Sequence, residues 1–195
     1  MSGLHDQPDD GATPLSPEER EGLIPAHISL RRELNQLEQQ NILEADVWAF
    51  DRQRPLTSEA FAKTLHRRMY GKVWNWAGSY RTTEKNLGVL PHEIQVRLIG
   101  VLQDFEYWIP NKIFPPDELG VRFHHALVAV HPFPNGNGRW SRLMGDLLAV
   151  QLGQPRFTWG RADLQTAGGG RAAYIEALQA ADGHNLDPLI AFARS

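Results

Sequence analysis

A histidine, a glycine loop and two arginines occur together in residues 131–142. His131 carries an imidazole that titrates near neutral pH and can take a proton from a hydroxyl group. The loop Gly136–Gly138 lets backbone N–H groups come close to an anion, and Arg139 and Arg142 follow it. Two guanidinium groups one helical turn apart suit a di- or triphosphate better than a single carboxylate. Base, anion-binding loop and paired cations together predict transfer of a phosphate-containing group.

Two predicted helices position this segment. Residues 117–130 carry apolar side chains at helical spacing, and Pro132 disfavours helical dihedrals at His131, so this helix ends there. A second helical pattern resumes at Leu143 and stops at Gly153. The glycine loop therefore leads into a helix N-terminus, where unpaired N–H groups and the helix dipole favour an anion.

This segment resembles the signature of the Fic family, which is written HPFx[D/E]GNGRxxR. The positions that match are His131, Pro132, Phe133, Gly136, Asn137, Gly138, Arg139 and Arg142. The resemblance implies a mainly α fold, with a Fic-type helical core and a short β-hairpin flap. It also implies a nucleotidyltransferase that moves AMP from ATP to a Ser, Thr or Tyr hydroxyl of a target protein. In that interpretation His131 is the catalytic base, and the nucleotide is bound by Gly136, Asn137, Gly138, Arg139 and Arg142.

One position departs from the signature. Asn135 stands where the family usually has Asp or Glu, whose carboxylate helps to hold Mg²⁺. An amide oxygen can ligate a hard cation but brings no charge, so we expect Asn135 to be a weak metal ligand. ATP as substrate and Mg²⁺ as cofactor remain the expectation. Doc-like relatives that act as kinases lack the Gly-Asn-Gly loop, so its presence favours nucleotidyl over phosphoryl transfer.

The bulk composition is that of one globular domain of 195 residues. A net charge of −3 without any basic run argues against direct nucleic-acid binding. The chain has no cysteine, which excludes disulfides and thiol chemistry. Because we find neither a signal peptide nor a membrane-length apolar run, we expect no membrane association and a cytoplasmic location.

The N-terminal part predicts two segments. Residues 1–22 are rich in Asp, Pro, Glu and Gly and predict a flexible arm, whereas residues 23–195 predict the Fic domain. The domain is expected to begin with a helix over about residues 29–50, with Ser29 as its N-cap.

This helix carries a candidate inhibitory residue. Some Fic proteins have an inhibitory helix, written [S/T]xxxE[G/N], whose Glu pairs with the second signature arginine and blocks the γ-phosphate site. Ser29 and Glu33 have this spacing, but Leu34 replaces Gly or Asn. Glu33 is therefore the candidate inhibitory residue and Glu38 the alternative. The other interpretation of Glu33 is one more charge on a solvated helix face.

A helix is also predicted over residues 57–70, with Thr57 as its N-cap. The run Val73-Trp74-Asn75-Trp76-Ala77-Gly78-Ser79-Tyr80-Arg81 that follows resembles the Fic core segment before the flap. In the family this flap holds the target by strand-like pairing. The residues predicted to form it are Thr83, Glu84, Lys85, Asn86, Leu87 and Gly88. An ordinary surface hairpin is the alternative.

Two further patterns favour structural roles. His124 and His125 invite a metal-site interpretation, but adjacent helical residues point about 100° apart, so both are predicted to be structural. The glycines at 168–170 lack the Lys-Ser/Thr finish of a phosphate loop and predict a linker.

The resemblance extends to a subgroup. Glu33-Leu34-Asn35, the Trp-x-Trp-Ala-Gly segment from Trp74 and the Asn135 variant resemble the Fic subgroup called mobile mystery protein B, which tends to be encoded beside a helix-turn-helix partner. Two alternatives to an AMP-transferring enzyme remain open. One is a nucleotide-binding regulatory module of low activity acting with a partner protein, and the other is an enzyme that removes AMP with the same site.

Overall fold

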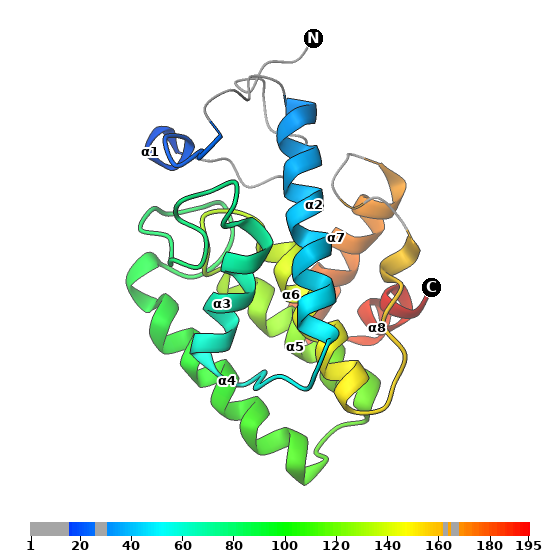
Figure 1. The fold of residues 1–195 in the computed structure, drawn as a ribbon. Coiled ribbons are helices and arrows are strands. Elements are labelled where there is room, and N and C mark those ends of the chain that lie inside the picture. Colours follow the sequence, from blue (N-terminus) through cyan, green and yellow to red (C-terminus); the bar gives the residue numbers. More distant parts are fainter. Residues whose placement is uncertain (1–15, 26–30, 162–163, 165–167) are drawn as a thin grey trace.

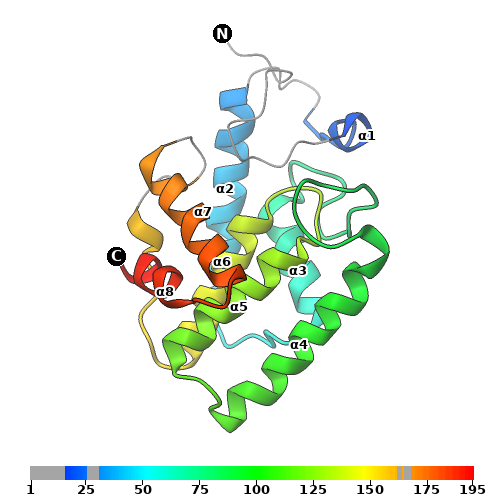
Figure 2. The ribbon, with the colours of Figure 1, turned by 180° about the vertical axis from the view of Figure 1, so that it is seen from behind.

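The fold is mainly helical, as predicted. The structure is a computed structural model that describes residues 16–25, 31–161, 164 and 168–195. Figures 1 and 2 show its helices, which are α1 (Pro17–Arg20), α2 (Arg31–Phe50), α3 (Glu59–Tyr70), α4 (Ile94–Asn111), α5 (Pro116–Val130), α6 (Asn137–Gln151), α7 (Gly169–Asp182) and α8 (Asp187–Arg194), with short 3-10 turns η1 (Pro91–Glu93) and η2 (Trp159–Arg161). Within these ranges, none of the helices combines the length and apolar character that a membrane span requires.

Consecutive helices α5 and α6 form the centre of the core. Their facing side chains are fully buried, among them Phe123 and Leu127 from α5 and Met144 and Leu148 from α6. Helices α3 and α4 complete this cluster, and α7 and α8 enclose a second cluster around Trp159 on the other side. The six-residue connection between α5 and α6, residues 131–136, is the signature loop, and the two helices that carry it are held by their buried facing side chains.

Helix α2 runs along α3 and reaches α6, as Figure 1 shows. An ion-pair network fixes its C-terminal half. Arg156 contacts Asp46 of α2 at 2.8 Å and Asp146 of α6 at 3.1 Å. The indole of Trp159 donates to the other Asp146 oxygen at 2.9 Å. The lower end of α2 is therefore tied to the core independently of the signature loop.

The helix boundaries differ from the predicted ones at their first residues. Ser58, not Thr57, caps α3, because its hydroxyl accepts from the N–H of Phe61 at 3.3 Å. Ser29, the predicted cap of α2, lies outside the described residues.

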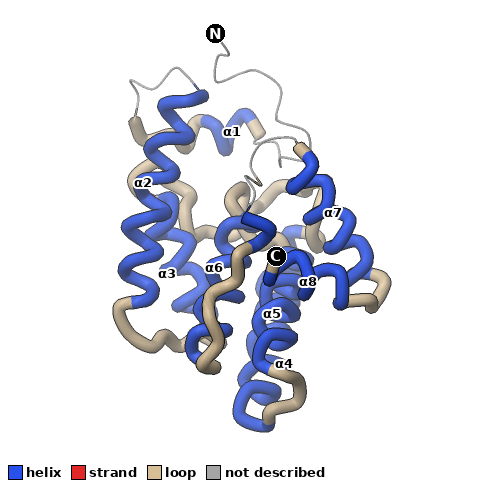
Figure 3. The backbone as a smooth tube through the Cα atoms, turned by 90° about the vertical axis from the view of Figure 1, so that its right-hand side faces the viewer, coloured by secondary structure: helices blue, strands red, loops and turns tan. Residues whose placement is uncertain are grey.

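The prediction that the flap forms a β-hairpin is wrong. Figure 3 shows no strand in the described ranges, and residues 82–90 form an irregular loop. The guanidinium of Arg81 accounts for this conformation. It donates to the carbonyl of Thr83 at 2.9 Å and to that of Val89, which are the two ends of the loop. These side-chain bonds stand where a hairpin would have its cross-strand ladder.

Residues 16–22, predicted as the end of a flexible arm, contain α1 and pack on the segment after α3. Trp76 donates its indole N–H to the carbonyl of Glu19 at 2.9 Å. Asn75 N–H donates to the carbonyl of Gly22 at 2.9 Å, next to an isolated bridge between Leu23 and Trp74. The first segment of the described chain thus lies against the loop that follows α3.

Candidate active site

His131 lies at the end of α5 in a strained left-handed conformation. Its φ is 53°, and its backbone N–H donates to the carbonyl of Leu127 at 3.3 Å, which closes the helix. The imidazole Nδ1 lies 3.3 Å from the carbonyl of Val128. A carbonyl oxygen can only accept, so Nδ1 carries the proton and Nε2 is left as the acceptor. This tautomer is the one that a general base requires.

The surroundings of His131 keep it neutral. Burial is the main cause that lowers the pKa of His131 to about 4, with a smaller contribution from the positive charges of Arg81 and Lys85 and a raising effect of the Val128 carbonyl. The side chain is almost completely enclosed, with 5% of the residue exposed. The base is therefore deprotonated at neutral pH without help from a carboxylate.

The glycine loop begins helix α6, as predicted. Gly136 is the N-cap with a φ of 78°, and a side chain there would collide with Tyr70. The side chain of Asn137 does not face a ligand. It accepts from the N–H of Phe133 at 2.9 Å and donates to the carbonyl of the same residue at 2.8 Å. Asn137 therefore fixes the loop, which leaves nucleotide contacts to backbone groups.

Asn135 offers at most one oxygen to a metal. Its side-chain oxygen accepts from the N–H of Gly136 at 2.6 Å. Within the described ranges, no group of three or more His, Asp or Glu residues is arranged to hold a metal ion. Mg²⁺ usually takes one or two protein ligands together with substrate phosphates and water. The residues present therefore fit a metal that arrives with a triphosphate, with Asn135 as a neutral ligand.

A glutamate of α2 contacts the first signature arginine. Arg139 Nη2 lies 2.9 Å from Glu38 Oε2, and Trp74 donates its indole N–H to Glu38 Oε1 at 2.7 Å. Glu38 is 8% exposed, so the pair is partly shielded from solvent. The predicted pair was Glu33 with Arg142. The contact in the structure is made by Glu38, one turn and a half further along α2, and it is made with Arg139.

Arg142 has an aromatic neighbour. Its guanidinium lies 5.3 Å from the ring centre of Tyr174 on α7. Tyr174 is in turn held through its hydroxyl, which lies 3.1 Å from Nε2 of the buried His124. A guanidinium over an aromatic face is oriented without being neutralised. His124 thus has the structural role predicted for it, and His125 pairs with Asp182 at 2.8 Å.

The predicted residues converge on one cavity of about 580 Å³. It is bounded by the signature loop, the first turn of α6, the upper half of α2 and one face of α7. Its lining includes His131, Asn135, Gly136, Asn137, Gly138, Arg139, Arg142 and Glu38. Asn86, Leu87 and Gly88 also line it, from the loop of residues 82–90, which we call the flap loop. Thr83, Glu84, Lys85 and Glu33 are not among the lining residues that the structure describes. The part of the cavity between α5 and α7 is lined by the apolar residues Val128, Ile175 and Leu178.

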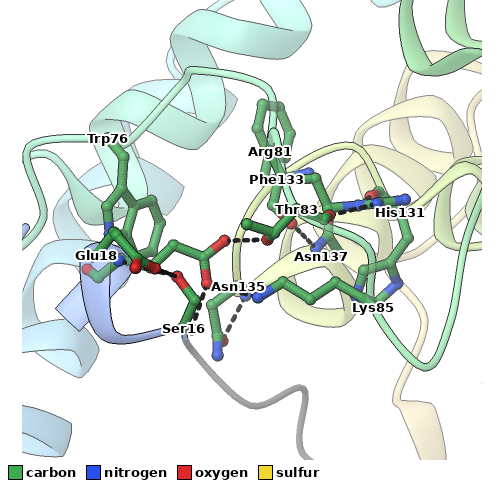
Figure 4. A network of polar contacts seen from close by, with 12 residues as sticks. Ser16, Glu18, Trp76, Arg81, Thr83, Lys85, His131, Phe133, Asn135 and Asn137 are labelled. Carbon is green, nitrogen blue, oxygen red and sulfur yellow. Dashed lines mark hydrogen bonds and ion pairs between the residues drawn. The ribbon is translucent and has the colours of Figure 1, made fainter. Parts of the chain in front are cut away.

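The flap loop is joined to the signature loop and to α1. Arg81 Nε donates to the carbonyl of His131 at 2.7 Å, and its backbone N–H donates to the carbonyl of Pro132 at 3.0 Å. Figure 4 shows Arg81 beside His131, with Thr83 and Lys85 nearby. Lys85 pairs with Glu19 of α1, and Thr83 donates to Glu19 at 2.8 Å. Lys85 is a buried ion-pair partner rather than an exposed flap residue.

Several site residues were not predicted. Arg81 and Trp74 lie in the run that resembles the Fic core. The resemblance therefore included them, but it assigned no role to either residue. Arg171 and Tyr174 line the cavity from α7, after the glycines at 168–170. His66 of α3 reaches the signature loop from below. A lone histidine on an amphipathic helix carries no signal that distinguishes it from a core residue.

Comparison with known proteins gives a consistent answer. The sequence model of the Fic/DOC family matches residues 55–149. The protein adenylyltransferase fic-1 of Caenorhabditis elegans is 30% identical over 132 residues, which are 66% of this chain and 25% of that protein. The protein adenylyltransferase Fic of Aedes aegypti is 29% identical over 134 residues, again 66% and 25%. The chain thus spans about a quarter of the length of these curated relatives.

Solved structures agree in fold. The BepC protein of Bartonella tribocorum, solved with bound AMPPNP, is 18% identical with a TM-score of 0.66, covering 92% of this chain and 97% of that one. Residues 134–508 of Fic-1 from C. elegans are 24% identical with a TM-score of 0.61, covering 89% and 50%. Residues 55–149 of this chain therefore form a domain of the Fic/DOC family.

Proposed function

We propose that this protein is a protein adenylyltransferase, which moves AMP from ATP to a Ser, Thr or Tyr hydroxyl of a target protein. The observation that carries the proposal is the convergence of His131, the N-terminus of α6 and two arginines on one cavity. The similarity of the chain to the protein adenylyltransferases of A. aegypti and C. elegans supports it. The cavity volume is within the range usual for sites of small molecules and cofactors.

The reaction assigns one task to each group. Nε2 of His131 takes the proton of the target hydroxyl, whose oxygen then attacks the α-phosphorus. The bond from that phosphorus to the bridging oxygen breaks, and pyrophosphate leaves. The backbone N–H groups of Asn137 and Gly138 at the start of α6 and the guanidinium groups of Arg139 and Arg142 stabilise the charge on the phosphates. The N–H of Gly136 donates to the Asn135 side chain instead. Mg²⁺, when bound with the triphosphate near Asn135, supplies charge neutralisation.

The resting protein is autoinhibited in this proposal. Glu38 neutralises Arg139, and an ATP phosphate must replace that carboxylate to use the guanidinium. Each ~1.4 kcal/mol of pairing free energy weakens productive ATP binding about tenfold. Glu33 remains the second candidate because it lies on the same helix.

The membership of the mobile mystery protein B subgroup, and with it a helix-turn-helix partner, also belongs to this proposal. The Asn135 variant and the Glu33-Leu34-Asn35 segment support the subgroup. The target docks, in the proposal, near Asn86, Leu87 and Gly88, which are the flap residues at the cavity.

The test is the fate of label from ATP. Purified protein is incubated with ATP labelled at the α- or the γ-phosphate, alone and with a mixture of cytosolic proteins. We expect α-label on protein, more with Glu38→Gln and about 10²–10⁴-fold less with His131→Ala, because the variant lacks its base. Protein-bound γ-label would identify a kinase. A Glu38→Gln variant that binds ATP but labels nothing would identify a binding module. If the unsubstituted protein removes AMP from labelled protein and Glu38→Gln does not, the protein is an enzyme that removes AMP.

A further inference from the structure

We propose that His66, which lies outside the signature, is a positioning residue for the anion-binding loop. It comes from α3 and has no exposed surface. Its Nε2 lies 3.0 Å from the backbone carbonyl of Asn135, and its Nδ1 accepts from the N–H of Gly78 at 3.0 Å. One imidazole thus joins the segment after α3 to the residue immediately before the glycine loop.

The two partners determine the proton position. The N–H of Gly78 is a donor, so Nδ1 must be unprotonated, and the carbonyl of Asn135 can only accept, so Nε2 carries the hydrogen. Burial lowers the pKa of His66 to about 3, so that the ring stays neutral at physiological pH. A cationic ring could not accept the bond from Gly78. The bridge therefore exists only in one protonation state and one tautomer.

The face of the ring fixes a second point of the loop. His66 stacks on Phe133 with ring centres 3.8 Å apart and planes 19° apart. Phe133 is fully buried and packs edge-on against Trp140 of α6. His66 therefore holds the loop at Phe133 through its face and at Asn135 through its edge.

These contacts determine the direction of the loop amides. Asn135 directly precedes Gly136, whose left-handed conformation turns the chain into α6. A peptide plane fixed at the Asn135 carbonyl also fixes the N–H of Gly136, which donates to the Asn135 side chain, because carbonyl and N–H belong to the same plane. This fixed turn sets the direction of the amides that follow it, those of Asn137 and Gly138 in the first turn of α6. Donors that are in place before charge develops stabilise a transition state more than mobile ones. This inference rests on the proposed function, since it assigns those donors to phosphate oxygens.

Two substitutions test the hydrogen bonds of the two ring nitrogens of His66 separately. In His66→Asn the amide oxygen replaces Nδ1 and keeps the Gly78 bond, but nothing replaces the Nε2–H donor. In His66→Gln the longer amide reaches the Nε2 position and keeps a donor toward Asn135. Both variants lose the aromatic stack, so each controls for the other.

In the Glu38→Gln background we expect kcat of His66→Asn to be about 10–100-fold below that of His66→Gln, with KM for ATP within about threefold, because a misplaced donor acts mainly on the transition state. If the role of His66 were purely structural, kcat would fall equally in the two variants, in step with their melting temperatures. Equal kcat values in two folded variants would overturn the inference.

A second measurement does not depend on turnover. Nitrogen NMR of the ring in the unsubstituted protein at neutral pH should find His66 neutral and protonated at Nε2, and the backbone amide signals of Gly136 and Gly138 should shift more in His66→Asn than in His66→Gln. A ring protonated at Nδ1, or equal shifts in both variants, would overturn the inference. If no protein form transfers AMP, the proposed function fails, and these signals still decide the role of His66.

Discussion

At the scale of single residues, His131 is a base prepared by its surroundings. The backbone carbonyl of Val128 selects its tautomer, and enclosure keeps it neutral. The sequence predicted the role from residue type and spacing. It could not predict the tautomer or the direction of the pKa shift, since these depend on Arg81 and Lys85, which are 50 and 46 residues away in the chain.

The lowered pKa of His131 leads to a pH prediction. A general base must be unprotonated, and its folded-state pKa of about 4 keeps it so well below the ordinary value of 6.5. We expect kcat/KM for AMP transfer to stay constant within about twofold from pH 8 to about pH 5.5. A fall with an apparent pKa near 6.5 would contradict the assignment of His131 in this environment.

Asn135 leads to a prediction about metal dependence. An Asp at this position keeps the acceptor for the N–H of Gly136 and adds a negative charge toward Mg²⁺. We expect Asn135→Asp to make ATP binding more dependent on Mg²⁺, with roughly a tenfold larger ratio of affinities with and without the metal, measured by calorimetry. The control is Asn111→Asp at the end of α4, which makes the same charge change away from the cavity. Equal ratios in both variants would exclude Asn135 as a ligand.

The inhibitory candidate shows what a short motif can and cannot predict. The spacing from Ser29 selected Glu33, because that pattern is written along one chain. The contact depends instead on how α2 crosses α6, which brings Glu38, held by the indole of Trp74, to Arg139. A crossing angle is a tertiary property that a four-residue spacing does not contain.

At the scale of elements, the helices were predictable and the flap was not. Helices α3, α5 and α6 follow from apolar periodicity. The end of α5 at His131 and the start of α6 after Gly136 follow from Pro132 and the glycine loop, whereas the N-cap of α3 is Ser58 and not the predicted Thr57. The loop 82–90 contains turn-forming residues typical of a hairpin, but its conformation is determined by the buried guanidinium of Arg81. Side-chain bonds to backbone carbonyls compete with strand pairing and leave no local signal in the loop sequence.

Arg81 therefore carries a stability prediction. Its guanidinium is the donor to carbonyls of Thr83, Val89 and His131, and losing it leaves buried acceptors without these bonds. We expect Arg81→Met to lower the free energy of unfolding by about 3 kcal/mol, measured by urea denaturation.

The matched control for this change is Arg97→Met on α4. Arg97 is mostly exposed, with a long contact of 3.7 Å to Glu93. A surface pair of this kind contributes about 0–1 kcal/mol. Similar losses for both variants would show that Arg81 is an ordinary surface arginine in solution and does not hold the flap loop.

At the scale of the whole molecule, three buried neutral histidines link folding to pH. Burial lowers the pKa of His66 to about 3 and that of His131 to about 4, and it lowers the pKa of His124 well below 6.5. In the unfolded chain all three titrate near 6.5. Below that value the unfolded state binds more protons than the folded state, so stability falls with falling pH. Burial raises the pKa of Asp146, and this single carboxyl opposes the trend.

We therefore expect the free energy of unfolding to decrease by up to about 1.4 kcal/mol per pH unit for each of these histidines as pH falls from 6.5 toward 4. Urea denaturation at a series of pH values measures the slope. His124→Gln should reduce the slope, whereas His92→Gln, at an exposed position, should not. An unchanged slope in His124→Gln would show that this ring titrates in the folded protein as it does in the unfolded chain.

The sequence predicted a mainly helical chain with a phosphate-binding loop between two helices, because both features are local. It did not predict that α1 packs on the flap loop through Glu19 and Lys85, since contacts between segments more than sixty residues apart depend on the whole fold. The sequence also did not predict that α7 packs near α6, which places Tyr174 beside Arg142, because this contact too depends on the whole fold.

The central claim is that the cavity binds ATP through Arg139 in competition with Glu38. Calorimetric titration of ATP with Mg²⁺ into the unsubstituted protein, Glu38→Gln and Glu33→Gln tests it directly. The Gln variant of Glu38 keeps an acceptor for Trp74 and removes only the charge, so we expect it to bind ATP at least tenfold more tightly, a change of about 1.4 kcal/mol. Glu33→Gln should match the unsubstituted protein. Equal affinities for all three proteins, or no binding by any of them, would contradict the account.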